Sequence, residues 1–183
     1  MRLLALDFET TGLDSVLGRV VEVGAVRFSL IPGGYIEEAS LACLVDPGMT
    51  IPRRASDIHG ISDADVAGAP SFGEVVRSLL ALAEGATIVA HNVRFDLSFL
   101  DAELARLGLS RGPAETADTV KLSRRAFPGR ASYRLGAIAA ALGIDAGAAH
   151  RALDDARTCM RLYSACMERL GGEGHLRSRG GPC

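Results

Sequence analysis

Leu3-Leu4-Ala5-Leu6-Asp7-Phe8-Glu9-Thr10-Thr11-Gly12 is the stretch that decides the fold of this 183-residue chain. Its apolar first half, residues 3–6, is typical of a strand that is buried on both faces. Side chains two positions apart in a strand project to the same face, so Asp7 and Glu9 are predicted to point together. Gly12 then ends the strand and lets the backbone come close to a ligand.

The pair of carboxylates at the end of this strand predicts a positively charged partner. Two acids beside an apolar strand repel each other and lose hydration. Carboxylate oxygens suit hard divalent cations such as Mg²⁺ and Mn²⁺. The alternative is an ordinary strand end with two solvated acids, because short motifs produce many false matches. Acids elsewhere in the chain decide between the two.

The composition is that of one globular domain. Hydrophobic residues make up 48% of the chain and charged residues 23%, which argues against disorder. The sequence has no run of about 18 apolar residues and begins with an acidic strand, so we expect a cytoplasmic protein without membrane association. The four cysteines form no CxxC pair, so neither a zinc site nor a disulfide framework is expected. The net charge of −2 excludes a protein that coats duplexes through basicity, but not an enzyme that grips a few nucleotides.

The order of the expected elements indicates an α/β domain with a mixed sheet. Two Val-rich or apolar strands, 19–30 and 40–45, follow the first through short turns and are therefore expected to be antiparallel. A long loop region is expected over 46–70. Helices and strands then alternate: helices over 71–84, 95–107, 121–127, 132–142 and 150–170, and strands over 86–90 and 115–120. This order predicts three antiparallel strands and then parallel strands, flanked by helices.

The domain is expected to span residues 1–170. Residues 171–183 are Gly-rich and polar and are predicted to form a flexible tail.

A third candidate acid, Asp96, lies near the start of the helix expected over 95–107. Phe99 and Leu100 follow it by one turn, which puts Asp96 on the stripe that faces the core. The alternative is a structural role, because an acid at a helix N-terminus also stabilises the helix dipole.

In the last helix, the adjacent Asp154 and Asp155 cannot both face inward. Steps of three or four residues from Asp155 reach an apolar stripe: Cys159, Leu162 and Cys166. The same steps from Asp154 reach a largely polar face: Thr158, Arg161, Ala165 and Glu168. Asp155 is therefore predicted to face the core and Asp154 the solvent. A buried acid needs a metal ion or another cationic partner.

His150 comes just before this helix, after the small residues 146–149. An imidazole titrates near neutral pH, so on a mobile loop it can take a proton from a water molecule. A lone histidine in such a place is more often simply exposed, and helical continuation would align it with Asp154 instead. The glycine and alanine run favours a helix that begins after His150.

Taken together, these residues resemble the DEDDh branch of the DnaQ-like 3′→5′ exonucleases, which includes the proofreading epsilon subunit of bacterial DNA polymerase III. Three segments match the family motifs: 7–13 (DFETTGL), 91–96 (HNVRFD) and 150–156 (HRALDDA). The segments His59-Gly60-Ile61 and Asp118-Thr119 are also similar to the family. The matches extend from residue 3 to about residue 165, in the family's order and spacing.

The resemblance implies a ribonuclease-H-like fold and a metal-dependent 3′→5′ exonuclease. It implies that four acids bind two divalent metal ions, Mg²⁺ or Mn²⁺, and that His150 is the general base. Those acids are Asp7, Glu9, Asp96 and Asp155. It further implies that these residues line the 3′-terminal nucleotide: Thr10, Thr11, Gly12, Leu13, His59, Asn92 and Phe95. Two cations about 4 Å apart would activate water on one side of the phosphate and stabilise the leaving oxygen on the other.

The expected partner is nucleic acid with a free 3′ end. Wedging by Leu13 and stacking by Phe95 would favour single-stranded or frayed DNA, with release of nucleoside monophosphates. Four arginines either grip the upstream backbone or form a solvated basic face: Arg124, Arg125, Arg130 and Arg134. A role in proofreading or repair makes a DNA polymerase a candidate partner.

Two other functions are weighed against this one. An exoribonuclease that trims RNA or short oligonucleotides would use the same acids. A catalytically silent nucleic-acid-binding or polymerase-associated module would keep the fold, but it would have no need of a buried acid cluster. Only a short Gly-rich segment follows residue 170, so a free-standing exonuclease and a nuclease domain of a longer protein both fit.

Overall fold

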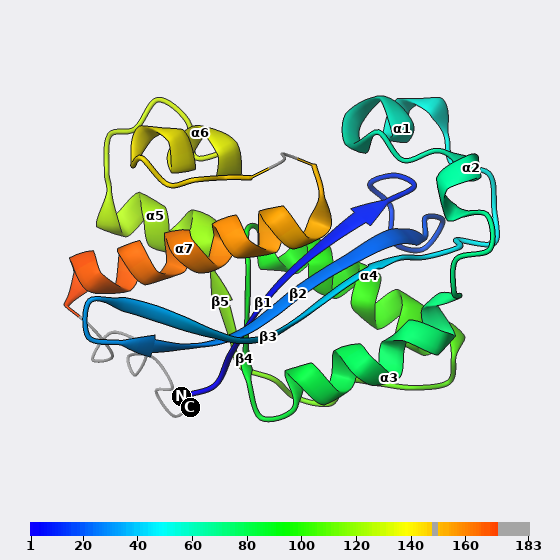
Figure 1. Cartoon of the computed structure of the whole chain (residues 1–183), viewed down its shortest axis with the longest axis horizontal. Helices are drawn as coiled ribbons and strands as arrows, with labels where there is room; N and C mark the ends of the chain where they lie inside the picture. The colour runs from blue at the N-terminus through cyan, green and yellow to red at the C-terminus, as the bar shows by residue number, and fades with distance from the viewer. Residues whose placement is uncertain (148–149, 172–183) are drawn as a thin grey trace, which may run out of the picture.

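The computed structural model describes residues 1–147 and 150–171. A five-stranded mixed sheet forms the centre of the molecule, and helices cover both of its faces (Figure 1). The strand order is β3-β2-β1-β4-β5. The strands are β1 (Leu3–Thr10), β2 (Val20–Ile31), β3 (Gly34–Leu44), β4 (Thr87–Ala90) and β5 (Thr116–Asp118). Strands β1 to β3 are antiparallel, β4 is parallel to β1 and β5 is parallel to β4, which confirms the predicted fold class.

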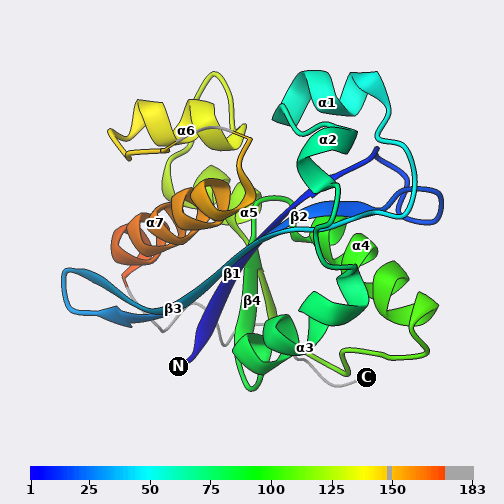
Figure 2. The same ribbon diagram turned by 45° about the vertical axis from the view of Figure 1, so that its right-hand side comes forward.

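The helices form two layers around this sheet. They are α1 (Arg53–His59), α2 (Asp63–Val66), α3 (Phe72–Ala83), α4 (Val93–Arg106), α5 (Thr119–Ala126), α6 (Leu135–Ala141) and α7 (Ala152–Leu170). Helices α3 and α4 pack on one face, and α7 lies across the other, with α5 and α6 beside it (Figures 1 and 2). None of the helices in the described ranges has the length and apolarity needed to cross a membrane.

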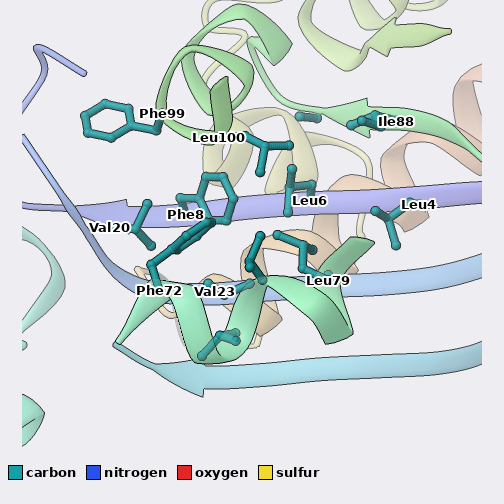
Figure 3. Packing of buried hydrophobic residues seen from close by; sticks show 14 of the residues in the cluster. Leu4, Leu6, Phe8, Val20, Val23, Phe72, Leu79, Ile88, Phe99 and Leu100 are labelled. Carbon is teal, nitrogen blue, oxygen red and sulfur yellow. The ribbon is translucent and has the colours of Figure 1, made fainter. Parts of the chain in front are cut away.

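Apolar side chains of β1 alternate between two cores, and this alternation sets the direction of the acids that follow. The cluster between the sheet and α3/α4 takes Leu4, Leu6 and Phe8, which lie together in Figure 3. The cluster beneath α7 takes Leu3 and Ala5. Because side chains alternate along a strand, the acids at positions 7 and 9 follow Leu3 and Ala5 to the α7 side.

Two expectations about the early part of the chain are wrong in detail. The predicted loop over 46–70 contains α1 and α2, which have 7 and 4 residues and are too short to produce a clear periodicity. The strand expected from residue 40 begins at Gly34, where it pairs with Ile31 across a hairpin. Residues 36–40 of β3 are exposed, so its first half lacks the apolar pattern that marks a strand.

Two further expectations concern the later part of the chain. The helix expected from residue 132 begins at Leu135 with Arg134 at its N-cap, and the Ser132 hydroxyl accepts the Arg134 N–H at 3.3 Å before the helix starts. The tail expected over 171–183 lies outside the described residues from position 172 onward.

Candidate active site

Strand β1 carries two acids on the face that α7 covers. Four cross-strand pairs of β1 and β2 occupy this face: Leu3–Phe28, Ala5–Val26, Asp7–Gly24 and Glu9–Glu22. The first two pairs are apolar and fully buried. The last two place acids in the same row, with Asp7 half-buried and Glu9 9% exposed. The face of β1 that α7 covers therefore ends in two carboxylates.

Helix α4 brings a third acid to the edge of β1. Strand β4 pairs with β1 only as far as Ala5. Further along, the backbone N–H of Phe8 donates to Asp96 Oδ1 at 3.2 Å. Asp96 is 3% exposed and Leu100 is 2% exposed, as the stripe on this helix predicted. The Asp96 carboxylate is thereby fixed beside the backbone that links the two acids of β1.

The start of α7 brings the fourth acid and the histidine. The helix begins at Ala152, two residues later than the expected range, so His150 precedes its first turn, as the glycine and alanine run predicted. The His150 N–H donates to Asp155 Oδ2 at 3.0 Å, and His150 has the left-handed backbone angle φ of 61°. Potential ligand atoms of Glu9, His150 and Asp155 all lie within 4.8 Å of one another. The structure thus brings the acids and the imidazole to one place, where β1 ends and α7 begins (Figure 1).

The predicted register of α7 is correct for Asp155 and holds only in part for Asp154. The stripe that continues from Asp155 is buried at Cys159, Leu162 and Cys166. The stripe from Asp154 was expected in solvent, but Thr158 is fully buried and its hydroxyl donates to the Ala146 carbonyl at 3.1 Å. Residues 145 and 146 contact this face, and helical periodicity does not reveal such a tertiary contact.

Burial, together with neighbouring negative charges, raises the pKa of all four carboxylates. Burial, followed by the charges of Asp96 and Asp155, raises the pKa of Asp7 well above its ordinary value. Burial and the charge of Asp155 raise the pKa of Glu9 to about 7. Burial raises the pKa of Asp96 to about 8, although backbone N–H groups act in the opposite direction. Burial also raises the pKa of Asp155. Without added positive charge, the cluster holds protons near neutral pH.

This donor set fits hard divalent cations. All four acids offer carboxylate oxygen, the ligand that Mg²⁺ and Mn²⁺ prefer. Burial, with a smaller contribution from neighbouring charges, raises the pKa of Glu9 and Asp96, and a bound cation would favour their charged forms. The four acids therefore fit the divalent metal ions that the resemblance implies.

The loop after β1 lies beside the acids and holds itself together. Thr10 and Thr11 are buried, and the Thr10 hydroxyl donates to the Gly12 carbonyl at 2.7 Å. The Thr11 hydroxyl accepts the N–H of Arg19 at 2.9 Å. Leu13 is 87% exposed at the tip. The hydroxyls serve the loop itself, whereas Leu13 presents an apolar surface to solvent.

A buried carboxylate that sequence reasoning missed anchors this loop to α4. Glu103 is 4% exposed, and its two oxygens contact Arg19 Nη1 at 3.1 Å and Arg106 Nη1 at 3.2 Å. Arg106 Nη2 also donates to three loop carbonyls, those of Ser15, Val16 and Gly18. The chain segment that presents Leu13 is therefore tied to α4.

His59, Asn92 and Phe95 come from three different local settings. His59 at the end of α1 is 6% exposed, and its Nε2 has no hydrogen-bond partner among the described residues. Burial lowers the pKa of His59, and the nearby Thr10 backbone acts in the opposite direction, so α1 reaches the end of β1. Asn92 caps α4 with φ of 74° and is exposed. Phe95 is half-buried and packs against Phe99, with 5.1 Å between ring centroids.

His91 belongs to the same motif but is tied into the fold. Its Nδ1 lies 2.9 Å from Thr119 Oγ1 and its Nε2 lies 2.8 Å from the Tyr133 carbonyl. Asp118 accepts the Asn92 N–H at 3.3 Å. The Asp118-Thr119 segment therefore supports the β4–α4 junction.

A mixed five-stranded sheet covered by helices on both faces is the ribonuclease-H-like fold, and solved exonuclease structures that are similar to this chain share it. Residues 4–163 match the exonuclease (RNase_T) family, and the chain belongs to this family.

Relatives of this chain carry the same domain in proteins of different size. DNA polymerase III subunit epsilon of Treponema pallidum (strain Nichols) is 39% identical over 162 residues, which cover 87% of this chain and 74% of that protein. The 3′-5′ exonuclease DinG of Bacillus subtilis (strain 168) is 33% identical over 92% of this chain, which spans only 18% of DinG. The solved structure of exonuclease X with 5′ overhanging duplex DNA is 29% identical and has a TM-score of 0.73, covering 94% of this chain and 93% of that chain.

Proposed function

We propose that this protein is a metal-dependent 3′→5′ exonuclease that acts on single-stranded or frayed DNA ends and releases nucleoside monophosphates. The observation that carries the proposal is the convergence of four acids and His150 where β1 meets α7. A structural role alone would not call for four neighbouring carboxylates whose pKa is raised by burial and by nearby negative charges. This argues against the catalytically silent module.

Each residue has a defined part in the proposed reaction. Asp7, Glu9, Asp96 and Asp155 would hold two Mg²⁺ or Mn²⁺ ions, which would supply the positive charge that offsets charge developing on the phosphate. An imidazole nitrogen of His150 accepts the proton of the attacking water. The water oxygen bonds to phosphorus, the bond from phosphorus to the 3′ oxygen of the preceding nucleotide breaks, and that oxygen takes up a proton.

The surroundings of the acids support a single terminal nucleotide as the substrate. The loop with the exposed Leu13 and the half-buried ring of Phe95 offer apolar contacts for a splayed base. The buried Nε2 of His59 is free to bond a polar group of the nucleotide or of its phosphate. Gly12 leaves space beside its backbone for a close approach of the sugar.

A basic cavity supports the path of the upstream strand. An open cavity of about 530 Å³ is lined by Arg124, Arg130 and Arg134, together with Tyr133 and His91. The Arg124 guanidinium carbon lies 4.6 Å from the centre of the Tyr133 ring. These arginines have no carboxylate partner among the described residues, so they are available to phosphates.

DNA is favoured over RNA because related proteins act with DNA. One relative is a subunit of a DNA polymerase, and exonuclease X was solved with duplex DNA. The epsilon relative likewise makes a DNA polymerase the candidate protein partner.

Turnover of a labelled oligonucleotide panel tests this proposal. Single-stranded DNA, duplex DNA and RNA of one sequence are incubated with Mg²⁺, Mn²⁺ or excess EDTA, with each end blocked in turn. We expect mononucleotide release that requires metal, is fastest on single-stranded DNA and stops when the 3′ hydroxyl is blocked. Faster hydrolysis of RNA would favour the exoribonuclease. Binding of each strand without any hydrolysis would overturn the nuclease proposal.

A further inference from the structure

Glu22 is a fifth acid beside the cluster, and it holds the beginning of α7. It lies opposite Glu9 on β2 and is 4% exposed. Glu22 Oε1 accepts from Arg151 Nη2 at 2.8 Å and from Arg151 Nε at 3.2 Å. Glu22 Oε2 accepts the backbone N–H of Ala152, the first residue of the helix, at 2.9 Å. One side chain therefore satisfies a helix N-terminus and a guanidinium together.

Gly24, two residues along the same face of β2, brings the helix close. A Cβ built on Gly24 would lie 2.0 Å from the carbonyl carbon of Ala152 and 2.3 Å from the N–H nitrogen of Leu153. Only a residue without a side chain permits this contact. Glu22 and Gly24 thus fix both the position of the first turn of α7 and its distance from the sheet.

Both α7 residues of the proposed site depend on this first turn. His150 immediately precedes Arg151 and holds a left-handed backbone conformation, which is unfavourable for a residue with a side chain. Its N–H is bonded to the carboxylate of Asp155, one turn into the helix. Contacts with the start of α7 keep His150 in place, and the Glu22–Arg151 pair fixes that start of the helix.

We propose that Glu22 and Arg151 are positioning residues that set the orientation of His150 and Asp155 for the hydrolysis. Direct metal binding by Glu22 is disfavoured, because both of its oxygens are occupied by Arg151 and Ala152. This inference rests on the proposed function, since it gives His150 the role of general base.

The same helix offers a matched control. Arg157 donates to Glu37 of β3 from Nη2 at 2.9 Å and from Nε at 3.2 Å, so it bonds a strand carboxylate through the same two nitrogens as Arg151. Arg157 lies seven positions, about two turns, farther along α7 than His150. If any ion pair between α7 and the sheet supports catalysis equally well, substitutions in the two pairs should lower kcat equally.

The experiment compares kcat and KM of Glu22→Ala and Arg151→Ala with those of Glu37→Ala and Arg157→Ala. Small displacements of reacting groups cost about 100-fold in rate, so we expect kcat to fall by about 10- to 100-fold in the first pair. KM should change little, because the residues proposed to bind the nucleotide lie on other elements. The control pair should keep the wild-type kcat. Equal kcat losses in both pairs, or unchanged kcat in the first pair, would overturn the proposal.

Two further measurements separate positioning from general destabilisation. Glu22→Gln keeps an oxygen that can accept the Ala152 N–H, so it should recover part of the activity that Glu22→Ala loses. In a His150→Ala background, Glu22→Ala should lower kcat by a smaller factor than in the wild type, because His150, one of the two groups that it positions, is gone. Full multiplicative losses would overturn the proposal. Should Glu22→Ala fail to fold, as judged by circular dichroism, Arg151→Ala carries the comparison, since the Arg151 side chain is 52% exposed.

His150→Ala measured alone distinguishes a failure of the proposed general base from a failure of the proposed positioning pair. If His150→Ala keeps full turnover, the proposed general base is wrong. If His150→Ala loses turnover while Glu22→Ala and Arg151→Ala keep it, the base stands and the positioning pair is wrong.

Discussion

The interface between α7 and strands β1 and β2 has an apolar half and an acidic half. In the apolar half, Phe28 lies edge-to-face with Tyr163 of α7, with 6.0 Å between ring centroids. In the acidic half, β1 presents Asp7 and Glu9, and α7 contributes Asp155. The backbone pairing is continuous across both halves. The halves differ only in side chains, so one strand pair supplies both a source of stability and a site that reduces it.

Burial has opposite energetic effects in the two halves of the interface. Burial of large apolar side chains such as Phe28 stabilises the fold by about 1.5–3 kcal/mol for each side chain. Burial of Asp96 and Glu9 instead raises their pKa, which shows that their charged forms are less stable here than in water. Substitutions in the apolar half should therefore change stability, and those in the acidic half should change activity.

The largest expected effect is in the acidic half, at Asp155. Asp155→Asn should lower metal-dependent turnover by about 10,000-fold, because a lost metal ligand removes several kcal/mol of transition-state stabilisation. Asp154→Asn is the matched control and should retain most of the activity, since Asp154 lies on the neighbouring stripe of α7. The measurement is single-turnover hydrolysis of a 3′-labelled oligonucleotide at saturating Mg²⁺. An exchange of the two phenotypes would contradict the assignment of the ligand to Asp155.

His150→Ala should lower turnover by about 100- to 10,000-fold, the usual range for a lost general base. Metal binding should survive, because His150 is proposed as the base and not as a ligand. The rate is measured at saturating metal over a pH series, since acid also protonates the carboxylates and could imitate the same profile. His150→Gln should be nearly as slow, because an amide cannot carry the proton. Near-full turnover in either variant would make His150 a bystander.

The corresponding test of the apolar half is Phe28→Ala. Phe28 is fully buried, so its truncation should lower the free energy of unfolding by about 3–5 kcal/mol. At a temperature where the variant remains folded, its specific activity should stay close to that of the wild type. Ile36→Ala on the neighbouring β3 is the control, because Ile36 is 52% exposed and its loss should have little effect. A large loss of activity in folded Phe28→Ala would show that the two halves are not separable.

The smallest effect concerns the metal-free protein. Acids with raised pKa bind more protons in the folded state than in the unfolded state, so stability falls as pH rises from about 4, the unfolded value, to about 8. Melting in EDTA should therefore show a lower Tm at pH 8 than at pH 5.5, and Mg²⁺ should raise Tm more at pH 8.

Asp7→Asn removes one charge and should flatten this pH dependence while activity is lost. A metal-free Tm that rises between pH 5.5 and pH 8 in the wild type would contradict the proposed repulsion.

Local patterns were sufficient to predict much of this site. Alternation along one strand predicted that Asp7 and Glu9 share a face, and helical spacing predicted the register of Asp155. Whether these groups perform the proposed chemistry stays a prediction. Contacts between distant segments were not readable in the same way. Glu22 could have been noticed as a lone acid within the Val-rich strand RVVEVGAV, but its partner Arg151 lies 129 positions away.

The fold was likewise predictable where local sequence patterns exist and not where distant contacts decide the structure. The long helices and strands show a clear periodicity of apolar residues, and their order along the chain therefore predicted the mixed sheet. No such periodicity marks the short helices α1 and α2 or the exposed first half of β3. These elements are stabilised by contacts with the rest of the fold. The burial of Thr158 beneath the segment at Ala146 is of the same kind.

Two glycines near the acids differ in the substitutions that the fold tolerates at their positions. Gly24 is an intolerant position, because even a methyl group would meet the backbone of Ala152 and push α7 off the sheet. Gly12 has no heavy atom of the described residues within 4 Å of a Cβ built on it, apart from itself and its chain neighbours, and its backbone does not have a positive φ. Libraries that vary the mouth of the site can therefore start at Gly12, and those that touch β2 should leave position 24 unchanged.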